Sequence, residues 1–134
     1  MTRQEWTNED GFVAVWVAIF AAVIVAGGGL IYDVTDKATE TRRATMIANE
    51  AGRAAAQELS ANVISGTGFS LDTAGAADAA RAHLSAAGVN GNVTVAGTEV
   101  IVTTQVPWTP SMMPLPSDTL TGTATINAEE VVAQ

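Results

Sequence analysis

His83 has the clearest capacity for acid–base chemistry in this 134-residue chain, because it is the only histidine. Asp78 precedes it by five positions and Ser85 follows by two, so the residue types of a Ser-His-Asp hydrolase are present. The sequence has no nucleophile-elbow pattern, however, which such a serine requires in most α/β-hydrolases. We therefore expect His83 to be a solvated residue on a helix face, and we expect no catalytic residues.

The sequence also contains few residues that could bind a metal or a cofactor. One histidine and no cysteine leave few ligands for zinc. Glu129 and Glu130 are adjacent, so on a strand they would point to opposite faces. The glycine-rich segments 26–32 and 66–70 lack the GxxxxGK[ST] pattern of a phosphate-binding loop. The formal net charge of −8 repels phosphate backbones, so we expect no nucleic-acid partner. Because the residues considered above form no recognisable site, we also expect no metal, cofactor or small-molecule substrate.

The first structural element that the sequence predicts is an uncharged stretch, residues 11–32. As a helix, residues 12–32 would span about 30 Å, which is the thickness of the hydrocarbon core of a bilayer. A remainder of about a hundred residues is too small to surround a helix that is apolar on every face. A cleavable export signal needs a basic N-terminal region and a shorter apolar core, whereas here Arg3 is accompanied by three acids. A retained transmembrane helix is favoured over both alternatives.

One face of this predicted span carries only small side chains. Its alanines recur at four-residue steps: Ala14, Ala18, Ala22 and Ala26. Small residues at this spacing let two membrane helices approach closely, so we expect the stripe to pack against another helix. The alternative is that alanine is simply common in this chain. Glycines 27–29 follow and weaken the helix, which leaves a bend open.

After the span, the periodicity becomes that of an amphipathic helix from 36 to about 62. The apolar positions of its predicted face are Ala44, Ala48, Ala51, Ala55 and Leu59, with Ile47 alongside. A second helix is expected to begin at a cap formed by Asp72 or Thr73 and to end at Gly88. Its narrow apolar face consists of Ala77, Ala80 and Leu84.

The remaining segments alternate with a period of two, which is typical of strands. Residues 92–106 predict a hairpin with its turn at Ala96-Gly97, and residues 119–131 predict a last strand with a threonine face toward water. The expected fold class is therefore α+β: a transmembrane helix continuing into a long amphipathic helix, a second helix, and a small antiparallel sheet of about three strands.

The segment 107–116 carries all four prolines, so it cannot be a regular central strand. Its large apolar residues are Trp108, Met112, Met113 and Leu115. Methionine and tryptophan in a loop can form an adaptable contact surface for a partner. The same side chains could instead fold back and close the open end of a small core, which is the favoured of the two interpretations.

The order of these segments resembles the TadE/TadG-like family of bacterial tight-adherence (Flp) pilus assembly proteins. In that family a glycine precedes an apolar span, an aspartate-containing stretch follows, and an alanine-rich helix with paired arginines continues the chain. Here these elements are Gly11, Asp33, Arg42 with Arg43, and the alanines within 44–56. The second helix, the hairpin, the proline-rich loop and the final strand are also similar to short members, so the resemblance covers nearly the whole chain.

Two features depart from the family pattern. TadE-type pseudopilins resemble type IV prepilins, which are cleaved after a glycine and carry glutamate at the fifth mature position. Gly11 and Phe12 are the candidate processing site here, but the fifth residue counted from Phe12 is Trp16. The chain is closer to TadG-like members, whose anchor is retained, although it is too short for their large adhesion-type domain.

Two indications of membrane orientation disagree. Arg3 stands before the span, and Lys37, Arg42 and Arg43 stand after it, so the positive-inside count favours a cytoplasmic C-terminus. The family orientation instead places the N-terminus in the cytoplasm. We expect the family orientation, because the C-terminal part is polar, acidic and threonine-rich.

The resemblance and the residues together give the expected organisation: a cytoplasmic segment 1–11, a transmembrane helix 12–32 and a small extracytoplasmic α+β domain 33–134. The expected function is that of a non-enzymatic, pseudopilin-like minor or accessory subunit of a Tad/Flp-type pilus or related secretion apparatus in the bacterial cell membrane. Its partners would be other assembly subunits or further copies of itself, together with membrane lipid. The alternative is a membrane-tethered binding module unrelated to pili.

Overall fold

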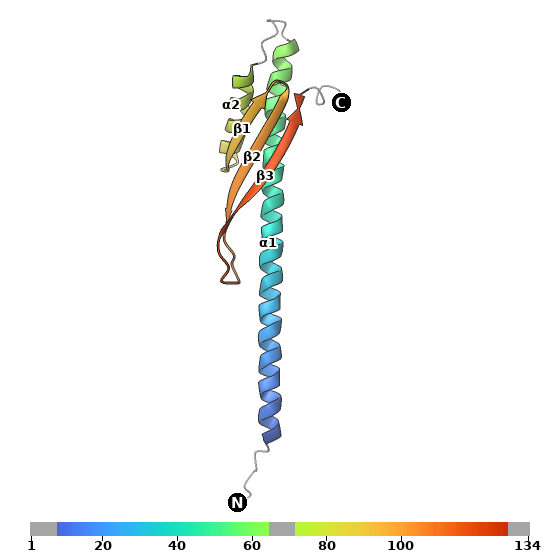
Figure 1. The fold of residues 1–134 in the computed structure, drawn as a ribbon, viewed down its shortest axis with the longest axis vertical. Coiled ribbons are helices and arrows are strands. Elements are labelled where there is room, and N and C mark those ends of the chain that lie inside the picture. The colour runs from blue at the N-terminus through green and yellow to red at the C-terminus, as the bar shows by residue number, and fades with distance from the viewer. Residues whose placement is uncertain (1–7, 65–71, 129–134) are drawn as a thin grey trace, which may run out of the picture.

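The computed structural model describes residues 8–64 and 72–128 of the chain, and it has the predicted α+β layout. Two helices precede three strands: α1 (Asn8–Ile64), α2 (Thr73–Ala86), β1 (Asn90–Ala96), β2 (Glu99–Trp108) and β3 (Asp118–Asn127). Figure 1 shows α1 as a long rod, with α2 and the sheet gathered around its C-terminal half. We call this gathered part, residues 33–64 and 72–128, the head. Glu129 and Glu130 and residues 65–71, which include the glycine-rich segment 66–70, lie outside the described residues.

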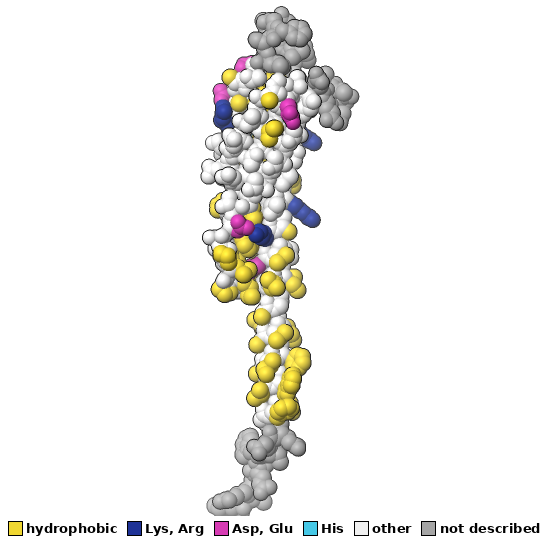
Figure 2. Space-filling model, viewed as in Figure 1, with side chains coloured by type: hydrophobic (Ala, Val, Ile, Leu, Met, Phe, Trp, Pro, Cys, Tyr) yellow, Lys and Arg dark blue, Asp and Glu magenta, His cyan; other side chains and the backbone are white. Residues whose placement is uncertain are grey.

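Helix α1 is continuous over 57 residues and passes through the three glycines 27–29 without interruption, so the optional bend is absent. Residues 11–28 of this helix are all exposed and largely apolar, and no other described element covers them. Among the described residues, this is the one helix long and apolar enough to cross a membrane. The exposed apolar side chains follow the rod in Figure 2.

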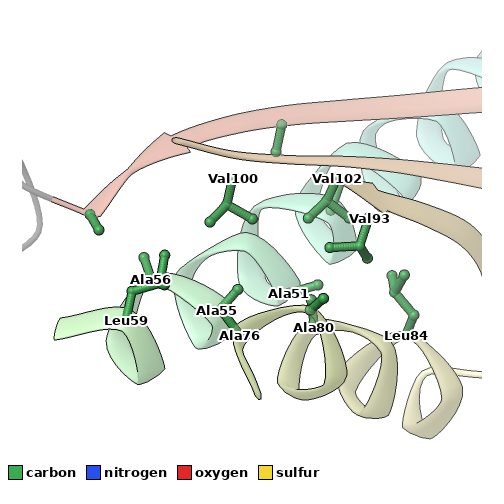
Figure 3. Close-up of a cluster of buried hydrophobic side chains, with 14 of the residues drawn as sticks. Ala51, Ala55, Ala56, Leu59, Ala76, Ala80, Leu84, Val93, Val100 and Val102 are labelled. Atoms are coloured by element: carbon green, nitrogen blue, oxygen red, sulfur yellow. The ribbon is translucent and has the colours of Figure 1, made fainter. Parts of the chain in front are cut away.

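The C-terminal half of α1 buries the alanine face that its periodicity predicts. The side chains at this face, with little or no exposed surface, are Ala44, Ile47, Ala48, Ala51, Ala55 and Leu59. Alanine lets the second helix and the sheet approach α1 closely, and α2 contributes Ala76, Ala80 and Leu84 to the same core. Figure 3 shows the labelled residues of the two helices, from Ala51 to Leu59 and from Ala76 to Leu84, facing Val93, Val100 and Val102 of the sheet. Because most of these side chains are small, the core depends on close backbone packing rather than on bulky groups.

Both ends of α2 have the local chemistry that the sequence predicts. The Asp72 carboxylate accepts a hydrogen bond from the Gly75 backbone N–H at 2.8 Å, which caps the first turn. Gly88 has φ of 68° just beyond the last turn, a left-handed conformation that glycine adopts without steric cost. The helix therefore ends where the chain must turn into β1.

The sheet is antiparallel with the strand order β1-β2-β3. Ala96 pairs with Glu99, so the turn of the first hairpin is Gly97-Thr98, one residue later than predicted. Gly97 has φ of 64°, which explains why the glycine lies within the turn. On β3, side chains alternate between the core and an exposed threonine face, as predicted.

Pro107 and Trp108 belong to β2, contrary to the prediction that the proline-rich segment begins outside the strands. They pair with Thr119 and Asp118 of β3. The pairing of β1 with β2 stops at Gln105, so this end of the sheet has only two strands. A proline is tolerated there, because β2 has become an edge strand.

Candidate functional site

The contact between α1 and the loop that joins β2 to β3 is the most unusual part of the molecule. This β2–β3 loop comprises residues 109–117 and extends beyond the sheet along α1, toward its apolar half (Figure 1). Asp33, Asp36 and Lys37 project from α1 at spacings of three and four residues, so they share one helix face. This face continues the alanine face of the core, but here charged groups meet the loop.

Asp33 is the centre of this contact. Its side chain is almost fully buried, with 1% of the residue exposed, although it is a carboxylate on a helix that is otherwise exposed at this level. Three consecutive backbone N–H groups donate to it: Ser111 and Met112 to Oδ1 at 3.0 and 3.2 Å, and Met113 to Oδ2 at 2.9 Å. Hydrogen bonds to an ionised acceptor are stronger than neutral ones. One side chain of α1 thus fixes the conformation of the loop tip.

A second group of contacts lies one turn further along α1. The Trp108 indole Nε1–H donates to Asp36 Oδ2 at 2.9 Å, and only 7% of Trp108 is exposed. Lys37 Nζ lies 2.7 Å from Asp118 Oδ2 and 5.3 Å from the centroid of the Trp108 ring. These contacts hold the two ends of the loop, where β2 stops and β3 starts.

The ion pair between Lys37 and Asp118 gives a testable prediction about pH. The hydrogen bond and charge of Lys37 lower the pKa of the exposed Asp118 carboxyl from its ordinary value. Because the pKa is lowered in the folded state, the pair stabilises the head above about pH 4 and loses this contribution as the pH falls through the lowered pKa. In a carbon-detected NMR titration, we expect Lys37→Met to return the pKa of Asp118 toward that of a free aspartate. An unchanged pKa in the variant would contradict the assignment.

The four apolar residues predicted as a partner contact separate into different environments. Trp108 is buried against α1 and Met113 is half-buried, whereas Met112 is 63% exposed and Leu115 is 45% exposed. Trp108 therefore packs on Asp36 and Lys37 of α1, where β2 ends. Met112 and Leu115 remain on the surface.

Gly29 marks the level at which the loop tip lies against α1. A Cβ atom at this position would lie 3.4 Å from Met112 Cβ and 3.8 Å from Met113 Sδ, whereas a Cβ at Gly27 or Gly28 would meet nothing within 4 Å. Of the three successive glycines, only Gly29 therefore faces the loop, and an alanine there would make ordinary van der Waals contact with it. The loop tip lies beside the last apolar turn of the helix.

The alanine stripe predicted to pack against another helix is fully available. Ala14, Ala18, Ala22 and Ala26 are all exposed, and no described element of this chain covers them. Gly11 and Phe12, the candidate processing site, lie on the exposed surface near the start of α1. The stripe ends at Ala26, and the β2–β3 loop contacts the next residues on the same side of α1, Gly29 and Asp33.

His83 is partly exposed on α2, as expected from the sequence, and its Nε2 lies 3.3 Å from Glu50 Oε2 on α1. Asp78, the acid of the triad considered above, instead pairs with Arg81 at 2.8 Å. Among residues 8–64 and 72–128, no three histidines or carboxylates are grouped closely enough to hold a metal ion.

The role of Asp33 was not predicted from the sequence, where it was noted only as part of a family pattern. Its partners are 78 to 80 residues away along the chain, so local periodicity carries no signal for the contact. One signal was available in the sequence. Residues 111–113 lie between two prolines and cannot join a regular strand, so their three N–H groups need an acceptor elsewhere in the protein.

The fold and this contact define an exposed apolar rod joined through one continuous helix to a small α+β head. No protein-family model matches the chain, and neither a curated protein nor a solved structure matches it significantly. Its function is therefore inferred from its own residues.

Proposed function

We propose that this protein is a non-enzymatic, membrane-anchored minor or accessory subunit of a Tad/Flp-type pilus or a related secretion apparatus. In this proposal residues 12–32 cross the bacterial cell membrane, and the head, residues 33–134 in the full chain, lies outside the cytoplasm. The protein acts through helix packing and subunit contacts rather than through chemistry. The resemblance of its segments to short TadG-like proteins supports this assignment.

The observation that carries the proposal is the exposed alanine stripe on an unbroken helix. Ala14, Ala18, Ala22 and Ala26 form a smooth surface that no described part of the chain covers. In lipid, helices associate through close backbone packing, because there is no hydrophobic drive between them. Since α1 continues without a break into the head, a partner that packs on the stripe also fixes the axis of the head.

Residues Ala18 and Ala22 provide the test. We expect the double variant Ala18→Leu, Ala22→Leu to lose several-fold in cross-linking to neighbouring subunits, because leucine side chains keep the two backbones apart. The measurement uses a photo-cross-linking amino acid at Val15, beside the stripe, in membranes of the bacterium that encodes the protein. Mass spectrometry then identifies the cross-linked partners, which should be pilus or secretion subunits, or a second copy of this chain.

A matched control places bulk on the opposite side of the helix. At 3.6 residues per turn, Phe20 and Ile24 lie about 200° around the helix from Ala18 and Ala22, so Phe20→Trp, Ile24→Phe should keep the cross-links. Equal loss in both double variants would contradict a role for the stripe. Cross-links only to proteins of unrelated function would contradict the assignment to a pilus apparatus.

The alternative, a membrane-tethered binding module unrelated to pili, predicts that bulk on the alanine stripe has no effect. Its proposed contact surface included Trp108, which is buried and bonded to Asp36. A Trp108→Ala variant would therefore disturb the head itself, and only Met112 and Leu115 remain as exposed apolar contacts.

A further inference from the structure

We infer that the tip of the β2–β3 loop, residues 110–116, is a second lipid contact of this protein and lies in the membrane interface beside the helix. The inference rests on the apolar half of α1 crossing a membrane, and it does not depend on the kind of assembly that the protein joins. Three properties of the tip support it: its level along α1, the state of its backbone donors, and its surface.

The level of the tip is fixed by its contacts with α1. Met112 and Met113 lie against Gly29, which is three residues inside the Tyr32 end of the span. At 1.5 Å per residue, this places the contact about 4.5 Å inward from Tyr32 along the helix axis. Apolar groups of membrane-surface elements lie about 5–10 Å into the boundary between headgroups and acyl chains. If residues 12–32 are in the bilayer, the loop tip is in its interface.

The backbone of the tip has no N–H group that needs water as a hydrogen-bond partner. Pro110, Pro114 and Pro116 have no N–H group. The three N–H groups of residues 111–113 donate to Asp33, and the Leu115 N–H donates to the Met113 carbonyl at 2.8 Å. Every backbone donor of residues 110–116 is therefore satisfied within the protein. An unsatisfied donor costs several kcal/mol in the hydrocarbon region, so this arrangement suits contact with lipid.

The surface of the tip is uncharged and, apart from Ser111, apolar. Residues 110–116 contain no charged side chain, and Met112 and Leu115 are exposed. Figure 2 shows apolar side chains at the end of the head nearest the rod, continuous with those of the rod, while the charged side chains lie further along the head. Tyr32, which is 54% exposed, marks the same level, and tyrosine is enriched at membrane interfaces.

Lipid is the occupant that these observations favour over a protein partner. The exposed tip adjoins a helix surface that already faces lipid, so the bilayer covers both without any further molecule. A partner subunit would have to reach the same depth to cover Met112. Insertion of the tip gives the head a second attachment to the bilayer and thereby limits rotation of the head about the helix axis.

Site-specific fluorescence quenching tests the inference, since the chain has no cysteine of its own. The full chain with Met112→Cys or Leu115→Cys carries an environment-sensitive NBD label in phosphatidylcholine–phosphatidylglycerol vesicles at a low protein-to-lipid ratio. Either substitution keeps the backbone N–H groups and hence their hydrogen bonds. We expect spin-labelled lipids with shallow acyl-chain quenchers to quench both labels several-fold more than a label at Thr123, on the exposed face of β3.

A label at Val25, within the span, separates failure of this inference from failure of the anchor. If the Val25 label is quenched by lipid and the labels at 112 and 115 behave like the one at Thr123, the loop is outside the bilayer and the inference is wrong. Shielding of the loop labels that develops only at a high protein-to-lipid ratio would also overturn it, in favour of contact between copies. Absence of lipid quenching at Val25 would refute the anchor on which the inference rests.

Discussion

Replacing Gly122 by alanine should lower the free energy of unfolding of the head by about 3 kcal/mol, although it adds a single methyl group. Gly122 is in β3 and faces α1, where the helix backbone comes closest to the sheet. A Cβ atom at this position would overlap the Ala44 carbonyl carbon and the Thr45 nitrogen. These are backbone atoms of a helix, so no rotamer change can relieve the overlap.

A buried hydrogen bond adds to the cost of this substitution. Thr104, the partner of Gly122 in the neighbouring strand, directs its Oγ1–H toward the Ala44 carbonyl at 2.9 Å, with the Gly122 carbonyl at 3.2 Å. If α1 moves away to make room for the methyl group, the longer of these contacts is retained and the bond to α1 is lost. A single hydrogen bond of this kind contributes about 1 kcal/mol, and overpacking a core costs typically 1–3 kcal/mol.

Hydrogen exchange of the β2 amides in detergent micelles measures this effect, because the sheet amides report opening of the head rather than of the whole of α1. Gly52→Ala is the matched control on the same interface. Its Cβ would meet Cγ1 of the half-buried Ile126 at 2.8 Å, so the Ile126 side chain must shift but no backbone atom is in the way, and alanine offsets part of the cost because it favours the helix by about 1 kcal/mol over glycine. We expect a much smaller change for Gly52→Ala. Equal changes in the two variants would contradict the importance of the backbone contact at Gly122.

The elements of the head were predictable because each depends on a short-range signal. The three- and four-residue spacing of Ala44, Ala48 and Ala51 defines one buried helix face, and that face is the one that packs. The alternation of Val100, Val102 and Thr104 assigns the inward side of β2, including the buried hydroxyl of Thr104. In both cases a local period already determines which side chains can leave water together.

The features that the sequence did not predict are contacts between segments that lie far apart along the chain. The alternation along β3 indicates that Gly122 faces inward, but no local pattern indicates that α1 approaches β3 closely at this residue. Asp33 was noted only as part of a family pattern, and its burial arises only when the β2–β3 loop folds onto it. The extension of β2 through Pro107 has the same origin, since it depends on where β1 stops pairing.

Replacing Asp33 by alanine should release the loop while the rest of the head stays folded. The three N–H groups of residues 111–113 lose their shared acceptor, and the prolines on either side prevent the segment from joining a regular strand. Hydrogen bonds to a charged group contribute about 1.5–3 kcal/mol each. Loss of two or more should therefore accelerate amide exchange at 111–113 by at least about a hundredfold. Asp33→Asn should give an intermediate effect, because an amide has one acceptor oxygen where the carboxylate uses both.

Asp36→Ala is the matched control for this prediction. It removes a carboxylate from the same face of α1, three residues away, and with it the hydrogen bond from the Trp108 indole. The N–H groups of residues 111–113 keep Asp33 as their acceptor, so their exchange should remain slow, while the indole N–H of Trp108 should exchange faster. If Asp36→Ala released residues 111–113 as fully as Asp33→Ala, the loop would be held by general packing on α1. If only Asp33→Ala releases them, a single buried carboxylate determines the position of the loop beside the apolar end of the helix.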